Sequence, residues 1–296
     1  MNGLLIVHKP TGLTSHDVVY KIRKWSGERR VGHTGTLDPL ASGVLVLCLG
    51  PATRLSEYLI SGNKRYRAIV RFGQTTATYD AEGEVIDQRA VDLSAADIEA
   101  AFDHFRGPIQ QVPPAFSAVQ INGRRAYDLA RKGQRLDLAP RAVTIHALSV
   151  CDWHSPDLTL DVTCSAGTYI RSLAHDLGGR LGPGGHLVGL TRTAVGTASR
   201  AFTLEDAHTL DHIQSAFKAG RGAELLRPAD WALSHWPEVL LDAAGTDRLQ
   251  HGHPVPMVDE GTGLGRAYDP HGNFIAIVEA DSTLRQWKPK KVLARA

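Results

Sequence analysis

The chain has 296 residues, of which 43% are hydrophobic and 22% are charged, and its formal net charge is +2. These values are typical of a folded protein with one large domain and a smaller one, and they exclude disordered, collagen-like and coiled-coil chains. No stretch approaches about 18 consecutive apolar residues, the N-terminus lacks the basic segment of an export signal, and the three cysteines (Cys48, Cys151 and Cys164) include no C-x-x-C pair, so we expect a cytoplasmic protein without disulfides or a membrane span.

The first third of the chain alternates short strands with short helices. Strands are expected at residues 4–7, 44–49 and 64–72, and helices at 15–25, 55–60 and 94–105. Ser15 is the expected N-cap of the first helix, and Ser94 with Asp97 forms a capping box that opens the third. The strand over 64–72 follows from strict alternation, in which Tyr66 and every second residue after it are apolar.

The rest of the chain continues this mixed pattern. Strands are expected at 116–121, 143–151, 158–163, 265–268 and 274–279, a turn at Asn122-Gly123, and a helix at 168–181 that ends at a glycine cluster. Because strands and single helices follow in irregular order, the fold class is α+β and not doubly wound α/β. A composition shift between residues 210 and 230 divides the chain into a large domain, 1–228, and a small, mostly β domain, 229–296, which ends in a Pro-Lys-Lys tail.

The charges are unevenly distributed. Residues 1–36 and 120–141 each hold six Lys or Arg against two acids, and the last twelve residues hold five more basic residues. Residues 78–105 hold eight acids against one arginine, which predicts an acidic side of the molecule. Basic faces suggest a polyanionic partner, although charge runs are equally common on ordinary solvated surface.

The familiar cofactor and hydrolase motifs are missing from the sequence. It contains no P-loop, no G-x-S-x-G and no H-E-x-x-H, and the glycine run at 261–265 has the wrong spacing and context for a nucleotide. The 14 histidines are scattered apart from His251-Gly252-His253, which lacks an acidic or cysteine partner at a metal-like spacing. We therefore expect neither a metal nor a cofactor.

One polar, glycine-rich segment, residues 30–43, precedes the most apolar strand of the chain. Asp38 within it is followed by Pro39, which biases the Asp38 backbone to an extended conformation and holds the carboxylate out from a rigid turn. On the dipeptide alone, an ordinary Asx-type turn is the simpler interpretation.

The longer segment GHTGTLDPLASG, residues 32–43, resembles the catalytic segment of the TruB family of tRNA pseudouridine synthases. Further motifs similar to that family follow its order: Lys9-Pro10 with Gly12 and Thr14-Ser15, Lys64-x-Tyr66-x-Ala68, QVPPAFSA at 111–118 and GTYIRSL at 167–173. The resemblance covers residues 3–195 and extends more weakly to a C-terminal PUA-like RNA-binding module. It implies the pseudouridine synthase fold, with a central mixed, mainly antiparallel sheet flanked by helices.

The resemblance implies a chemistry and a set of site residues. Pseudouridine formation breaks the N1–C1′ bond of uridine, rotates the base and rejoins it through C5, which requires an ionised carboxylate and a base for the lost proton. Asp38 is the expected nucleophile, and whether it attacks the base or the sugar, or assists a glycal intermediate, stays open. Arg171 is expected to hold this carboxylate, and Tyr66 to stack on the uracil and to take the proton.

The remaining expected residues bind the substrate. Tyr169 would stack on the extruded uracil, Leu190 would wall the pocket, and Lys9 belongs to the substrate-binding set. Because the target base must leave the RNA stack, His33 would fill the space that it vacates. Without the resemblance, Arg171 would be read as a helix-surface ion pair and Tyr66 and Leu190 as core residues.

Three residues depart from the family pattern: His8, Thr191 and Gly185. His8 stands where an Asp or Asn is usual and would alter a supporting hydrogen bond. Thr191 interrupts a Leu-Arg-Arg-Thr run, and Gly185 replaces an alanine. The last two weaken only what the resemblance implies about local RNA contacts.

The expected partner is the T arm of tRNA, with uridine 55 as the target, and we expect a monomer that needs no protein partner. One alternative is a non-catalytic RNA-binding or tRNA-folding protein of the same fold, but that would be expected to lose Asp38 or Arg171. An unrelated carboxylate hydrolase would leave the basic stretches unexplained. A guide-RNA-dependent synthase would carry extra lysine-rich segments.

Overall fold

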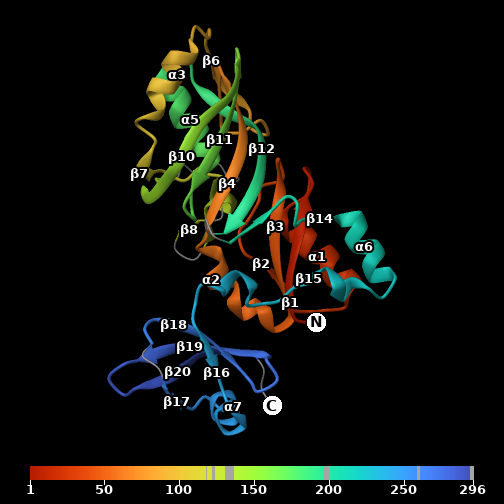
Figure 1. The fold of residues 1–296 in the computed structure, drawn as a ribbon. Coiled ribbons are helices and arrows are strands. Elements are labelled where there is room, and N and C mark those ends of the chain that lie inside the picture. Colours follow the sequence, from red (N-terminus) through yellow and green to blue (C-terminus); the bar gives the residue numbers. More distant parts are fainter. Residues whose placement is uncertain (118, 122–123, 131–136, 197–199, 259–260, 294–296) are drawn as a thin grey trace.

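Two separate β-sheets organise the chain (Figure 1). The computed structural model describes residues 1–117, 119–121, 124–130, 137–196, 200–258 and 261–293. Within these residues the large sheet has the strand order β14-β1-β3-β12-β4-β11-β10-β7, with β13, β15 and β2 joined at its sides. The small sheet has the order β16-β18-β19-β20-β17.

The large sheet comprises β1 (Gly3–Lys9), β2 (Val31–His33), β3 (Ala41–Leu49), β4 (Asn63–Phe72), β7 (Gly107–Gln111), β10 (Arg141–His154), β11 (Asp157–Cys164), β12 (Gly185–Gly196), β13 (Ala201–Thr203), β14 (His208–Thr209) and β15 (Leu226–Arg227). Strand β1 pairs parallel with β14, β3 pairs parallel with β12, and the other pairs in this sheet are antiparallel. The expected mixed, mainly antiparallel sheet is confirmed.

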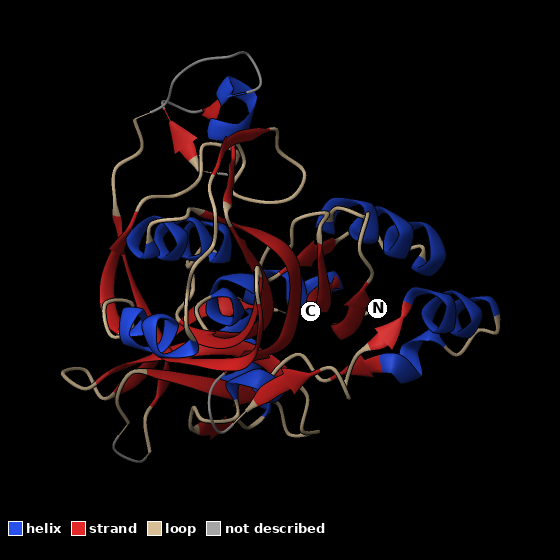
Figure 2. Ribbon diagram, turned by 90° about the horizontal axis from the view of Figure 1, so that it is seen from above, coloured by secondary structure: helices blue, strands red, loops and turns tan. Residues whose placement is uncertain are grey.

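The helices are α1 (Ser15–Ser26), α2 (Ser56–Ile60), α3 (Ala95–Phe102), α4 (Ala126–Ala130), α5 (Ile170–Leu181), α6 (Leu210–Lys218) and α7 (Ala243–Gln250). Helices α3 and α5 contact each other and pack on the strands of the large sheet. Seen from above, the curved strands of that sheet partly enclose helices (Figure 2). The α+β class is therefore confirmed.

The small sheet comprises β16 (Glu238–Leu240), β17 (Val255–Pro256), β18 (Leu264–Tyr268), β19 (Phe274–Asp281) and β20 (Gln286–Val292). Two short hairpins, β5 (Gln74–Thr76) with β6 (Val85–Gln88) and β8 (Gln120–Ile121) with β9 (Arg124–Arg125), form two-stranded sheets of their own. Because β20 spans the expected Pro-Lys-Lys tail, that expectation was wrong: Pro289 lies inside a strand, opposite Val278.

The core lies on both faces of β1 and β3. Leu5 and Val7 belong to a cluster that also contains α1 and the inner residues of β4, while Leu4 and Ile6 face a second cluster. This second cluster includes Ile277 of the small sheet, so the C-terminal part shares a hydrophobic cluster with the large sheet. Burial on both faces explains why residues 43–49 are almost continuously apolar.

Several sequence expectations need correction. The N-cap of α1 is Thr14, whose hydroxyl accepts from the backbone N–H of Asp17 at 3.0 Å. Strands β7 and β12 and helix α6 were not expected, and the predicted strand over 116–121 is reduced to β8. The predicted turn at Asn122-Gly123 lies outside the described residues.

Candidate active site

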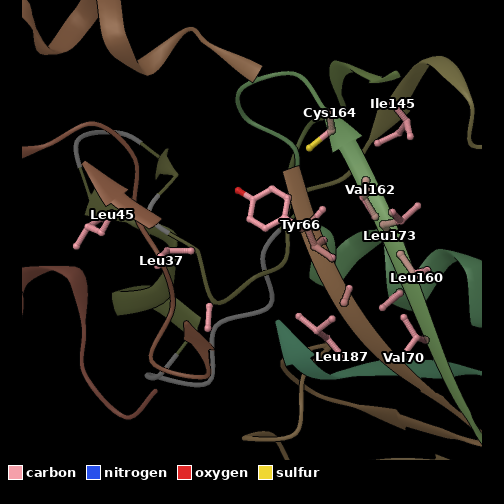
Figure 3. Close-up of a cluster of buried hydrophobic side chains, with 14 of the residues drawn as sticks. Leu37, Leu45, Tyr66, Val70, Ile145, Leu160, Val162, Cys164, Leu173 and Leu187 are labelled. Atoms are coloured by element: carbon pink, nitrogen blue, oxygen red, sulfur yellow. The ribbon is translucent and has the colours of Figure 1, made fainter. Parts of the chain in front are cut away.

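Asp38 lies in the loop between β2 and β3, and its neighbours fasten this loop to the protein. Leu37 is buried in the core (Figure 3). The Ser15 hydroxyl accepts from the Leu37 N–H at 2.8 Å and donates to the Leu37 carbonyl at 3.1 Å, while the N–H of Gly12 donates to the carbonyl of Pro39 at 2.8 Å. The Asp38 side chain itself is 40% exposed. The carboxylate is thus held by its neighbours and remains open to a substrate.

Arg171, in the first turn of α5, is the ion-pair partner of Asp38. Its Nε lies 3.0 Å from Asp38 Oδ2, a close charge contact in which the N–H is not aligned as a hydrogen bond. Nη1 donates to the carbonyl of Thr78 at 3.2 Å and lies 3.3 Å from Asp80 Oδ2, and Nη2 donates to the carbonyl of Phe116 at 3.0 Å. The side chain is only 7% exposed. A planar guanidinium with partners on several sides is held in one orientation.

Asp80 completes this network and was not singled out from the sequence. We placed it in the acidic surface stretch 78–105, but it is 3% exposed, so that interpretation was wrong for this residue. Its carboxylate accepts from the Thr78 hydroxyl and, at 3.1 Å, from the backbone N–H of Glu82. A buried carboxylate requires such partners, and Arg171 supplies the opposite charge. The turn-forming run TYDAEG at 78–83 was the available signal.

Tyr66 of β4 lies directly opposite Arg192 of β12, so both side chains project from the same face of the sheet. Tyr66 extends from β4 toward the part of the core that holds Leu37 and Leu45 (Figure 3). Burial raises the pKa of the Tyr66 hydroxyl above its usual value of 10, so the phenol is neutral near neutral pH.

Arg192 was also missed as a functional residue. It is 2% exposed, and its guanidinium donates to three backbone carbonyls, those of Val44 at 2.7 Å, Gly35 at 3.0 Å and Thr36 at 3.3 Å. Two of these carbonyls belong to the loop that leads to Asp38. Arg192 therefore fastens that loop to β12, next to Tyr66.

Lys9 is fully buried at the end of β1. Its Nζ donates to the carbonyls of Pro10 at 2.9 Å and Leu13 at 2.6 Å. Burial lowers its pKa from 10.5 to about 8, and the negative charge of Asp38 opposes this shift. The amino group is thus engaged within the protein, and a contact between Lys9 and the substrate stays a prediction.

The other expected binding residues lie on segments that border the Asp38–Arg171 pair. His33 is half-buried at the end of β2, and burial lowers the pKa of its imidazole below 6.5. Tyr169 is the N-cap residue of α5, where Gln111 binds both its N–H (2.8 Å) and its carbonyl (3.0 Å). Leu190 is partly buried on β12, opposite Ala68 of β4.

Two of the three departures from the family pattern, Thr191 and Gly185, make contacts within the protein. The Thr191 hydroxyl is hydrogen bonded to that of Ser42 at 3.0 Å, four residues after Asp38. Gly185 is buried where α5 meets β12, and a Cβ there would lie 3.0 Å from the carbonyl of Ala174. Any bearing of the Gly185 departure on local RNA contacts stays a prediction. His8, in β1, lies opposite Val44.

Within the residues that the structure describes, no group of three or more His, Cys, Asp or Glu side chains could hold a metal ion. Over the same ranges, no helix is long and apolar enough to cross a membrane. All three cysteines are free thiols.

Sequence comparison finds matches to two family profiles. Residues 23–170 match the profile described as TruB family pseudouridylate synthase (N terminal domain), and residues 171–234 match the profile described as tRNA pseudouridylate synthase B C-terminal domain. The tRNA pseudouridine synthase B of Thiobacillus denitrificans is 46% identical over 282 residues, which cover 95% of this chain and 93% of that protein. The protein of the same name from Burkholderia lata is 48% identical over 257 residues, or 87% and 78% of the two chains.

Two solved complexes contain chains with a similar fold. A chain of the crystal structure of a Cbf5-Nop10-Gar1 complex superposes with a TM-score of 0.73 at 26% identity, covering 99% of this chain and 85% of that one. A chain of an H/ACA RNP bound to a substrate RNA containing 2'-deoxyuridine gives 0.72 at 25% identity, with the same coverage.

Proposed function

Because the chain belongs to the TruB family of pseudouridylate synthases, we propose that it isomerises uridine to pseudouridine at conventional position 55, in the T loop of tRNA. The enzyme is an isomerase, so its product contains the same atoms as its substrate in a different arrangement. The observation that carries the catalytic assignment is the Asp38–Arg171 pair, which lies within two motifs similar to the family's catalytic segment and arginine motif. The T-loop position rests on membership of the family.

Asp38 acts as the nucleophile in this proposal. Its carboxylate stands beside a permanently charged guanidinium and remains accessible, which suits an ionised group that must meet a substrate. Arg171 orients it, and Asp80 with the Thr78 carbonyl orients Arg171 from the other side. Attack on the base, attack on the sugar and assistance to a glycal each require the same ionised, oriented carboxylate.

Tyr66 stacks on the flipped uracil and relays the proton that leaves C5 when the new C1′–C5 bond forms. Because its pKa is raised, the phenol is neutral, so its hydroxyl releases its own proton to another acceptor as it accepts the proton from C5. The proton regained at N1 balances the isomerisation. No redox change occurs, and no metal or cofactor enters the proposal.

Base flipping in this proposal involves His33, Tyr169 and Leu190. The imidazole of His33 is neutral near neutral pH because burial lowers its pKa, so its flat ring stacks as an uncharged surface in the place of the extruded base. Tyr169 offers a second ring at the start of α5, and Leu190 walls the pocket from β12. The positive charge of Lys9 interacts favourably with the carboxylate of Asp38.

We assign residues 1–228 to the catalytic domain and 229–296 to a PUA-like RNA-binding domain of a monomeric, cytoplasmic enzyme that needs no protein partner. The assignment is supported by β15, which ends at Arg227 and still pairs with β1, and by the small sheet, which begins at Glu238. Three lysines of β20 form ion pairs with acidic side chains: Lys288 with Asp281, Lys290 with Glu279 and Lys291 with Glu57. Phosphates would have to exchange with these carboxylates, which makes binding there sensitive to salt.

Tritium release from a tRNA transcript labelled with [5-³H]uridine tests the function, without added metal or cofactor. Wild type should release tritium, and Asp38→Asn should release none while it retains RNA binding. Asp157→Asn is the matched control, since Asp157 pairs with the partly exposed Arg71 on β4. The control should keep wild-type activity.

The position is tested with a second transcript in which uridine 55 is replaced by cytidine. Loss of release from this transcript supports the T-loop assignment, and undiminished release contradicts it. If folded wild type binds tRNA but releases no tritium from the intact transcript, the catalytic assignment fails and the chain is an RNA-binding protein of the same fold.

A further inference from the structure

Tyr79 and His175 form a ring stack next to the residues that contact Arg171, the ion-pair partner of Asp38. The ring centroids are 3.8 Å apart and the planes are 11° from parallel. Tyr79 lies in the turn between β5 and β6, and His175 lies on α5. Neither residue was singled out from the sequence.

The stack lies in register with the network around Arg171. His175 follows Arg171 by four residues on α5, so the two side chains lie on the same side of the helix. In the turn, Arg171 contacts the residues on either side of Tyr79, namely the carbonyl of Thr78 and the carboxylate of Asp80. Successive residues of the turn are thus bound alternately by Arg171 and His175.

The backbone of the turn is strained and needs such support. Tyr79 has a φ of 64°, in the left-handed region that residues other than glycine rarely adopt. Its carbonyl accepts from the N–H of Leu187 at 3.0 Å, and the N–H of Ala81 donates to the carbonyl of Leu187 at 2.9 Å. These bonds fix the turn to β12, while the ring stack adds to the contacts that Arg171 makes between the turn and α5.

The imidazole contributes its flat face to this contact. The His175 Nδ1 is buried and has no hydrogen-bond partner within the described residues. A buried polar atom without a partner reduces stability, so hydrogen bonding by this atom does not account for a histidine here. A phenylalanine ring would keep the stacked face.

We propose that the Tyr79–His175 stack is a positioning device for the isomerisation, which holds the 78–80 turn on α5 so that Asp80 and the Thr78 carbonyl keep Arg171 aimed at Asp38. Neither ring touches the reacting atoms, so both are positioning residues. This inference rests on the proposed function, because its readout is pseudouridine formation.

The test measures the single-turnover rate of tritium release and, separately, the Kd for tRNA and the melting temperature. Tyr79→Leu and His175→Leu keep apolar bulk and remove the stack, whereas Tyr79→Phe and His175→Phe keep it. We expect each Leu variant to lower the rate by about tenfold to a hundredfold, because small misplacements of catalytic groups have effects of that order, with Kd changed less than about twofold. The Phe variants should stay within about threefold of wild type.

A double variant, Tyr79→Leu with His175→Leu, separates the stack from two independent effects. If the rings act as one device, the double variant should be no slower than the slower single variant. The proposal is overturned if the rate losses of the two single variants multiply in the double variant, or if the Leu variants lose affinity for tRNA alone. It is also overturned if the Leu variants react at the wild-type rate, or if the Phe variants are as slow as the Leu variants. If Tyr79→Leu does not fold, His175→Leu tests the same contact from the half-buried helix position. Inactive wild type would instead count against the proposed function.

Discussion

Replacing Arg192 by Met removes the clamp between β12 and the loop of the candidate nucleophile. The side chain is 2% exposed and donates to three carbonyls at 2.7, 3.0 and 3.3 Å. Hydrogen bonds from a charged donor contribute about 1.5 to 3 kcal/mol each, so two full bonds and a weaker third sum to about 4 to 7 kcal/mol. Removing the buried charge returns several kcal/mol of desolvation, which leaves a net loss of about 2 to 4 kcal/mol.

Thermal unfolding followed by circular dichroism measures this loss. For a chain of this size, 1 kcal/mol corresponds to about 2 to 4 °C, so Arg192→Met should melt roughly 4 to 16 °C below wild type. The matched control is Arg67→Met, which removes an exposed arginine paired with Asp161 at 2.9 Å. Exposed pairs contribute at most about 1 kcal/mol. If the melting temperature of Arg192→Met equals that of Arg67→Met, the three hydrogen bonds do not stabilise the loop and the reasoning is refuted.

Three further predictions follow from the site and its packing. Arg171→Lys should lower the single-turnover rate by about a hundredfold at nearly unchanged Kd for tRNA, because one ammonium cannot replace a guanidinium that contacts two carboxylates and two carbonyls; a rate near wild type would contradict this. Gly185→Ala should lower the melting temperature by about 2 to 4 °C, since its Cβ would lie 3.0 Å from the Ala174 carbonyl and 3.2 Å from Gly178 Cα; an unchanged or raised value would show that the helix shifts freely. The pKa of Lys9 is about 8 in the folded protein, below the ordinary value of 10.5, so the unfolded chain binds more protons between these two pH values. The free energy of unfolding of wild type, measured with urea relative to Lys9→Met, should therefore rise by about 1 to 2 kcal/mol from pH 7.5 to 9.5. A difference between the two proteins that does not change with pH would contradict the lowered pKa.

The elements with local signals were predictable from the sequence. The alternation around Tyr66 gave β4, and the capping box at Ser94 gave the start of α3, because both patterns depend on residues within one turn or one strand. The pairing of Asp38 with Arg171 was expected only through the family resemblance, since 133 residues separate the two motifs.

The elements and residues that were missed depend on contacts between distant segments. Strand β12 contains the buried Arg192. An arginine at a buried position breaks the apolar pattern by which a strand is predicted, and the backbone carbonyls that accept its hydrogen bonds cannot be identified from the local sequence. Asp80 stands in a run of acids, most of them on the surface, and its burial follows from Arg171, which lies 91 residues later in the chain. Such charges enter a core only where partners from other segments compensate their desolvation, and local patterns carry no record of those partners.

Close backbone contacts at two glycines determine how the segments that bear Asp38, Arg171 and Arg192 pack together. Gly43, the last residue of the segment similar to the family's catalytic loop, has a φ of 105°, and a Cβ there would lie 2.2 Å from the Arg192 carbonyl. At Gly178 of α5 a Cβ would lie 2.1 Å from the nitrogen of Gly185 in β12. The first contact brings β12 beside the strand that follows Asp38, and the second brings the helix of Arg171 onto β12. Since a side chain at Gly43 or Gly178 would push two backbones apart, these glycines set the spacing across which Asp38, Arg171 and Arg192 act.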